Sequence, residues 1–154
     1  MGNARMWSSL FVGMMLVAAA CGSGDAMTGD DLAECIALSK GSLGGSSNLI
    51  SAPVLLLPDV GAYPEGASDA EVEAEFDRRF SEAYGIEVDD FMDLRAEADA
   101  ATTASMGEPP GVGELVGDEW FVERDIKLMM LWNDRHPASA KAFCALIADE
   151  RQAS

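Results

Sequence analysis

The chain has 154 residues, with 10 Lys and Arg against 27 Asp and Glu and a formal net charge of −17. This length suits one domain with a real core and is too short for two full-sized domains. So acidic a chain argues against a nucleic-acid partner, because cationic contacts to phosphate supply most of that affinity. The 49% hydrophobic content argues against wholesale disorder, and the single His argues against most multi-histidine metal and haem sites.

The first twenty residues have the form of a secretory signal peptide. One charge, Arg5, is followed by an uncharged run from Met6 to Ala20, which is shorter than the ~20 apolar residues that span a bilayer. A basic head, an apolar middle and a small-residue end are typical of a signal for export. An uncleaved membrane anchor is the alternative.

The end of this segment, VAAAC at residues 17–21, resembles the lipobox of bacterial lipoproteins, although Ala18 stands where that family prefers Leu. The resemblance, which covers residues 1–21 only, implies that Cys21 receives a diacylglycerol thioether and becomes the acylated first residue of the mature chain. It implies a protein exported and anchored to a membrane. Gly22, in place of the Asp that retains some Gram-negative members at the inner membrane, favours the outer membrane in such a host. The alternative is a plain signal peptide with Cys21 as an ordinary thiol.

With Cys21 acylated, Cys35 and Cys144 remain as a pair in an oxidising compartment. They enclose nearly the whole mature chain, and in the chain-entropy treatment a loop of ~100 residues contributes ~4.7 kcal/mol. Redox catalysis is the rival interpretation, but it is typical of closely spaced thiols such as C-x-x-C, which this sequence lacks. The sequence thus predicts a structural disulfide between Cys35 and Cys144.

Behind the signal we expect a flexible, lipidated tether over 21–27 and a single helical domain over 28–151. Thr28 predicts the N-cap of a first helix, which extends to about Ser39 and ends at Gly41.

Residues 41–67 predict one long irregular segment that contains Gly and Pro. Pro53 and Pro58 interrupt its apolar run, and proline breaks helices. We therefore expect an extended segment packed over the core. A groove lining or a partner-docking surface is the alternative for the same run.

The clearest predicted helix follows this segment. Ser68 and Glu71 match a capping box, apolar residues recur every four positions from Val72 to Tyr84, and Gly85 is a good helix stop.

A further helix is predicted to begin at Asp89 or Asp90, either of which can cap it. Apolar residues at helical spacing form its inner stripe: Phe91, Leu94, Ala98 and Ala101. The Gly and Pro residues within 105–117 then predict a loop.

Asp118 predicts the cap of the next helix, which extends to Asn133. Its second half, 126–132, is apolar nearly all round, which indicates burial on several sides; an exposed apolar face is the alternative. Pro137 suits the first position of a last helix. The predicted fold class is therefore all-α, a small bundle of four or five helices.

A search for catalytic chemistry finds little. Three residues in one helix junction, His136, Ser139 and Asp134, rarely converge into a triad, and a capping position is favoured for His136. Carboxylate pairs one helical turn apart lack the E-x-x-H motifs of di-iron bundles, so they indicate solvated faces. We expect no catalytic residue, no metal ligand and no cofactor.

These patterns favour a non-catalytic, lipid-anchored protein of the cell envelope that acts as a binding, adaptor or protective module. Its expected partners are the membrane, through the lipid on Cys21, and an envelope protein. A groove between 49–57 and 120–132 would support this hypothesis. The alternative is a carrier of a small apolar ligand or a cation, with the apolar face of 126–132 opening into a pocket. A cell-wall enzyme would require a deep cleft with two close carboxylates of split pKa values.

Overall fold

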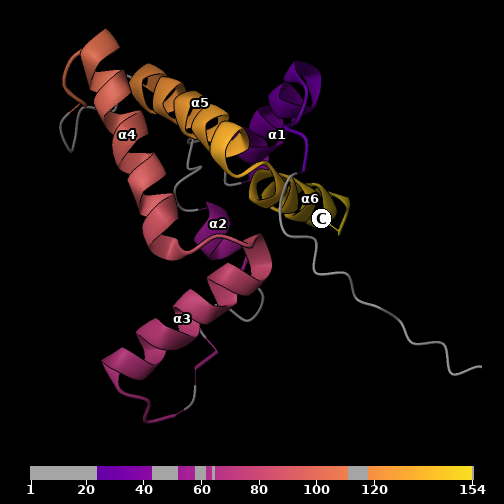
Figure 1. Cartoon of the computed structure of the whole chain (residues 1–154), viewed down its shortest axis with the longest axis vertical. Helices are drawn as coiled ribbons and strands as arrows, with labels where there is room; N and C mark the ends of the chain where they lie inside the picture. Colours follow the sequence, from indigo (N-terminus) through magenta and orange to yellow (C-terminus); the bar gives the residue numbers. More distant parts are fainter. Residues whose placement is uncertain (1–23, 43–51, 58–61, 64, 111–117, 154) are drawn as a thin grey trace, which may run out of the picture.

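The computed structural model describes residues 24–42, 52–57, 62–63, 65–110 and 118–153, and every regular element among them is a helix. Five helices have 14 to 19 residues, and one is a single turn of 4 residues. The predicted all-α bundle is confirmed. The helices, shown in Figure 1, are α1 (Gly29–Ser42), α2 (Ala52–Leu55), α3 (Asp69–Tyr84), α4 (Val88–Met106), α5 (Asp118–Arg135) and α6 (Pro137–Ala153).

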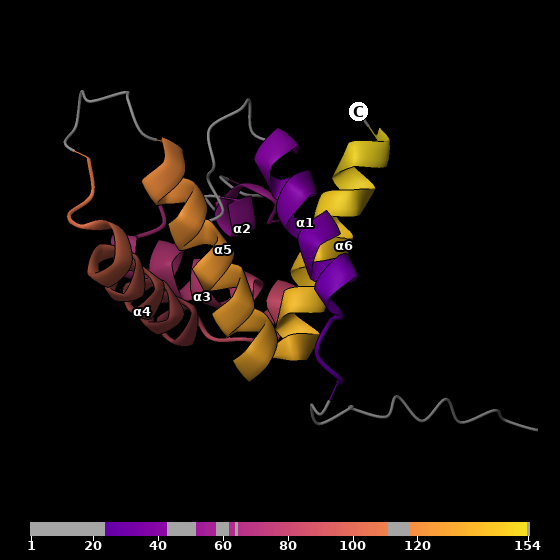
Figure 2. The same ribbon diagram turned by 90° about the horizontal axis from the view of Figure 1, so that it is seen from above.

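The helices form a layered bundle in which α5 is the central element. It packs on α4 along one side and on α1 and α6 along the other. In Figure 2 the start of α1, the end of α5 and the start of α6 lie at one end of the bundle, and the end of α6 lies at the opposite end. Helices α1 and α6 therefore run parallel, whereas α5 runs antiparallel to both.

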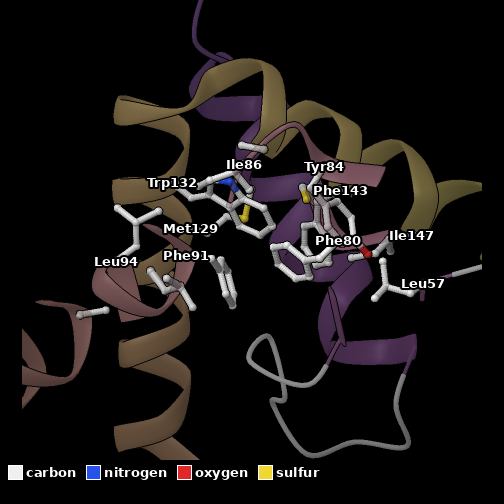
Figure 3. Close-up of a cluster of buried hydrophobic side chains, with 14 residues drawn as sticks. Leu57, Phe80, Tyr84, Ile86, Phe91, Leu94, Met129, Trp132, Phe143 and Ile147 are labelled. Atoms are coloured by element: carbon white, nitrogen blue, oxygen red, sulfur yellow. The ribbon is translucent and has the colours of Figure 1, made fainter. Parts of the chain in front are cut away.

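Aromatic side chains from α3, α4, α5 and α6 form the centre of the core (Figure 3). Neighbouring rings have centroids 4.9 to 6.1 Å apart, mostly tilted or edge-on, a geometry that adds ~0.5–1.5 kcal/mol per pair beyond burial. The five rings belong to Phe80, Tyr84, Phe91, Trp132 and Phe143.

The polar atoms of this cluster find partners inside the core. Trp132 Nε1 donates to Ser139 Oγ at 2.8 Å, and the Tyr84 hydroxyl donates to the Pro53 carbonyl oxygen at 2.7 Å. Burial also raises the pKa of Tyr84. A buried Tyr or Trp usually finds such a partner, so these two bonds fix the rings in place.

Helix α1 starts as predicted and ends later than predicted. The Asp31 backbone N–H donates to Thr28 Oγ1 at 3.4 Å, as expected for a Thr28 cap. Gly41 does not stop the helix, which continues to Ser42. Glycine in a helix costs only ~1 kcal/mol relative to Ala, so it weakens a last turn without forbidding it.

The prediction of an extended segment over 41–67 is wrong at residues 52–55, which form α2. Pro53 is tolerated there because it lies in the first helical turn, where its missing N–H would have no intrahelical acceptor. Its carbonyl accepts the Tyr84 hydroxyl, which fastens α2 to α3. Pro58 lies outside the described residues.

Helix α3 matches its prediction at both ends. The Ser68 backbone N–H donates to Glu71 Oε2 at 2.8 Å, and the Glu71 N–H donates to Ser68 Oγ at 3.4 Å, which completes the capping box. Gly85 adopts a left-handed φ of 66° and its N–H donates to the Ser81 carbonyl at 2.8 Å.

Helix α4 differs from its prediction at the start. The N-cap position belongs to Glu87, whose side chain makes no capping bond, so the expected cap at Asp89 or Asp90 is wrong. Both Asp residues lie instead in the first turn, where a negative charge interacts favourably with the helix dipole.

The inner stripe of α4 also differs at its far end. Ala101 is exposed and Thr102 is fully buried in its place. A threonine fits there because its hydroxyl donates to the Ala98 carbonyl at 2.8 Å, which satisfies the polar atom within the helix. The predicted loop over 105–117 starts late, since the helix continues to Met106, and residues 111–117 lie outside the described residues.

Helices α5 and α6 are close to prediction. Helix α5 includes Asp118 as its first residue and extends two residues past Asn133. Within 126–132, the burial expected is found for Leu128, Met129 and Trp132. Three other side chains are half-buried, and Met130 is 55% exposed. Pro137 is the first residue of α6, as predicted.

Candidate functional site: the docked tether and the disulfide

The residues just before α1 are fastened to the end of α5. The Met27 backbone N–H donates to Asn133 Oδ1 at 2.8 Å, and Asn133 Nδ2 donates to the Met27 carbonyl oxygen at 3.2 Å. Asn133 is buried, and the backbone of Met27 provides hydrogen-bond partners for both the oxygen and the nitrogen of its side-chain amide. The expected flexible tether is thus held at residue 27, and Cys21 lies outside the described residues.

The same segment, residues 24–27, also touches the start of α6. A side chain at position 24 would come within 3.7 Å of the Ala138 Cβ, so Gly24 lies against the first turn of α6. Around it is a pocket of about 140 Å³ that Gly85 and residues 135–139 complete. It is smaller than the ~300–1,000 Å³ of ordinary ligand pockets.

The charged groups around the junction of α5 and α6 are partly paired. Arg135 forms a hydrogen-bonded ion pair with Glu97 of α4 at 2.6 Å, and these bonds raise the pKa of Arg135. His136 occupies the junction between α5 and α6, where its carbonyl accepts the N–H of Ala140 at 3.0 Å. The capping position expected for His136 is confirmed for its backbone.

Cys35 and Cys144 form the predicted disulfide, with 5.4 Å between their Cα atoms. The bond joins the parallel helices α1 and α6. Cys35 is buried and Cys144 is half-buried, on the inner stripes of their helices. Because the chain has three cysteines, Cys21 remains outside this bridge.

A shallow groove of about 270 Å³ runs over the disulfide between α1 and α6. Its lining is mostly apolar and includes two acidic residues, Asp31 and Glu34. The apolar lining residues are Met27, Cys35, Leu38, Cys144, Ala145 and Ala148. This volume is just below that of ordinary ligand pockets.

An acidic pocket of about 350 Å³ lies beside the start of α3, lined by Glu65, Glu71 and Glu75 together with residues 66–67. Hydrogen bonds from Arg78 and then Arg79 lower the pKa of Glu75 to about 2. The backbone N–H of Ser68 lowers the pKa of Glu71. A general acid at neutral pH requires a raised pKa, so these shifts run opposite to what acid catalysis needs.

Sequence reasoning missed a buried charge cluster between α4 and α5. Arg124 Nη2 lies 2.8 Å from Asp125 Oδ1, and both side chains are less than 10% exposed. The guanidinium also lies over the ring of Phe121 at 5.2 Å, and its Nε is 3.9 Å from Asp99 Oδ1, a buried atom with no hydrogen-bond partner. One signal was available: Arg124 and Asp125 precede the buried Leu128 and Met129 by four residues, so they share their helix face.

The three residues considered for a triad have other roles. Ser139 is buried and its hydroxyl oxygen accepts the Trp132 indole N–H, so it supports the core. Asp134 is exposed at the end of α5, beside Arg135. Among the described residues, no group of three or more His, Cys, Asp or Glu side chains is placed to hold a metal ion.

A groove between 49–57 and 120–132 would have supported a binding role, but the described part of 49–57 packs into the core. Pro53 and Leu57 are both buried, and Leu57 belongs to the core cluster. Residues 49–51 lie outside the described residues. Within the described ranges, no helix is long and apolar enough to cross a bilayer.

Comparison with known proteins gives no relative: no family model, no curated protein and no solved structure matches the chain.

Proposed function

We propose that this protein is exported, acylated at Cys21 and held on a membrane as a non-catalytic binding, adaptor or protective module of the cell envelope. Its partners are the bilayer, through the lipid, and an envelope protein. In a host with two membranes, Gly22 favours the outer one.

The observation that carries the proposal is the pairing of Cys35 with Cys144. Such a bridge persists in oxidising compartments outside the cytosol. It leaves Cys21 as the odd cysteine at the end of an apolar segment that resembles a lipobox. Two acyl chains on one residue hold a protein stably in a bilayer, at ~0.8 kcal/mol per buried CH₂.

A non-catalytic role is supported by the state of the polar groups in the domain. Hydrogen bonds from Ser68 lower the pKa of Glu71, and hydrogen bonds from Arg78 and Arg79 lower that of Glu75. Ser139 is engaged in the core by Trp132. These groups serve stability rather than proton transfer.

Metabolic labelling tests the proposal. Cells that express the full chain are grown with radiolabelled palmitate, alongside a matched Cys21→Ser variant. We expect label in the wild-type band, none in the variant, and release of the variant from the membrane fraction. A wild-type band without label would contradict the proposal.

The groove between α1 and α6 favours a second candidate, a carrier of a small ligand. Its mostly apolar lining with two carboxylates suits a small cationic amphiphile. Native mass spectrometry of the purified protein tests this role: a co-purified adduct lost on Ala148→Trp supports it, and a bare protein mass contradicts it.

A further inference from the structure

The fastening of residues 24–27 limits how the domain can sit on a membrane. Two hydrogen bonds from buried Asn133 hold Met27 at the end of α5, and Gly24 lies against Ala138 at the start of α6. Residues 24–27 thus lie over the corner of the bundle where α5 meets α6 (Figure 2).

The reach from that corner to the proposed lipid is short. Cys21 precedes Gly24 by three residues, and a fully extended chain spans at most ~3.6 Å per residue, so the two Cα atoms are within about 11 Å of each other. A free tether that began at residue 28 would have had more than twice that reach.

The corner also lies at one end of the long axis of the bundle. Helix α6 starts there and has 17 residues, which gives a length of about 25 Å at 1.5 Å per residue. Helix α1 runs parallel to it, and Figure 2 shows both helices leading away from the same end. An anchor at the corner therefore leaves the last turn of α6 as one of the most distant points.

We infer that the lipid on Cys21 holds the α5–α6 corner, residues 134–138, against the lipid headgroups, so that α1 and α6 stand upright on the bilayer. This inference rests on the acylation proposed above and deepens it, because it names the headgroup surface as the partner of this corner.

Short-range fluorescence quenching measures this orientation. A fluorophore is attached to the full-length, acylated protein through Asp134→Cys or, as the matched control, through Gln152→Cys; both residues are exposed, at opposite ends of the bundle. Each protein is placed in phosphatidylcholine vesicles that contain a lipid spin-labelled at its headgroup. Neutral lipid avoids repulsion of the acidic chain. We expect several-fold stronger quenching at position 134 than at 152, and equal quenching would overturn the inference.

Two further variants test whether the short segment between Cys21 and Gly24 sets the orientation. A long Gly-Ser insert between Ser23 and Gly24 leaves the domain unchanged and is expected to abolish the difference between the two probes. Asn133→Ala, which frees Met27, is expected to reduce it. A difference in quenching between positions 134 and 152 that persists with the long insert would show that the short segment does not set the orientation.

Intact mass separates the two failures. A protein with no lipid adduct would overturn both the proposed acylation and this orientation. A lipidated protein with equal quenching at the two positions would overturn the orientation alone.

Discussion

At the scale of single residues, the pair Arg124 and Asp125 places two charges in the packed side of α5. Removing charges from water costs several kcal/mol each, and attraction offsets this only when the geometry is good and other polar atoms help. Arg124 gains two hydrogen bonds to Asp125 and the face of Phe121. Each member of the pair therefore depends on the other.

Replacing Arg124 with Met removes the guanidinium and leaves the Asp125 carboxylate buried without it. Breaking one partner of a buried pair costs ~3–5 kcal/mol, so we expect a loss of this size in the free energy of unfolding, measured by urea titration. The matched control is Arg78→Met, whose exposed ion pairs are worth ~0–1 kcal/mol. Equal losses in the two variants would contradict this account of Arg124.

Individual contacts between distant residues were the least predictable feature. The hydrogen bonds of Met27 with Asn133 join residues 106 positions apart, and no local sequence pattern predicts them. Cys35 and Cys144 were predictable, because three cysteines with one assigned to a lipid leave a single pairing.

At the scale of elements, the end of α3 depends on one backbone conformation. Gly85 has a φ of 66°, and the same turn leads directly into α4. An L-residue with a side chain pays roughly 1–2 kcal/mol in this region. Gly29, the first residue of α1, has a right-handed φ and open space where a Cβ would go.

The two glycines should therefore respond oppositely to alanine. Gly85→Ala is expected to lower the free energy of unfolding by roughly 1–2 kcal/mol, whereas Gly29→Ala is expected to raise it by ~0.4–1 kcal/mol through the unfolded state. Thermal unfolding followed by circular dichroism measures both. A Gly85→Ala protein as stable as wild type would refute the conformational argument.

Helix boundaries were predictable where local chemistry determines them. The capping box at Ser68 and the stop at Gly85 are interactions within a few residues, and both were found. Helix α2 was not predicted, because the contact that holds it is not local. The Tyr84 hydroxyl donates to the Pro53 carbonyl from 31 residues away. The buried Thr102 was missed because its hydroxyl is satisfied by its own helix.

At the scale of the whole molecule, one covalent bond joins the first and last helices. The disulfide encloses 109 residue positions, so its loss increases the freedom of nearly the entire unfolded domain. The effect is on the global equilibrium and not on one helix.

The double variant Cys35→Ala, Cys144→Ala is expected to lose ~2–5 kcal/mol of the free energy of unfolding, as for native disulfides in small secreted domains. Cys21→Ser is the control and should leave the urea midpoint of the detergent-solubilised domain unchanged, since Met27 fastens the tether independently of Cys21. A loss in the control as large as that in the double variant would contradict the assignment of Cys21 outside the bridge.

The parallel course of α1 and α6 gives this bond a mechanical consequence. A pull between Gly24 and Ala153 passes along the first part of α1, crosses from Cys35 to Cys144 and leaves through the last two turns of α6. The helices between Cys35 and Cys144 lie outside that covalent line of tension, so stretching the molecule between its two ends unravels only its outermost turns. Only after chemical reduction does the force reach the aromatic core.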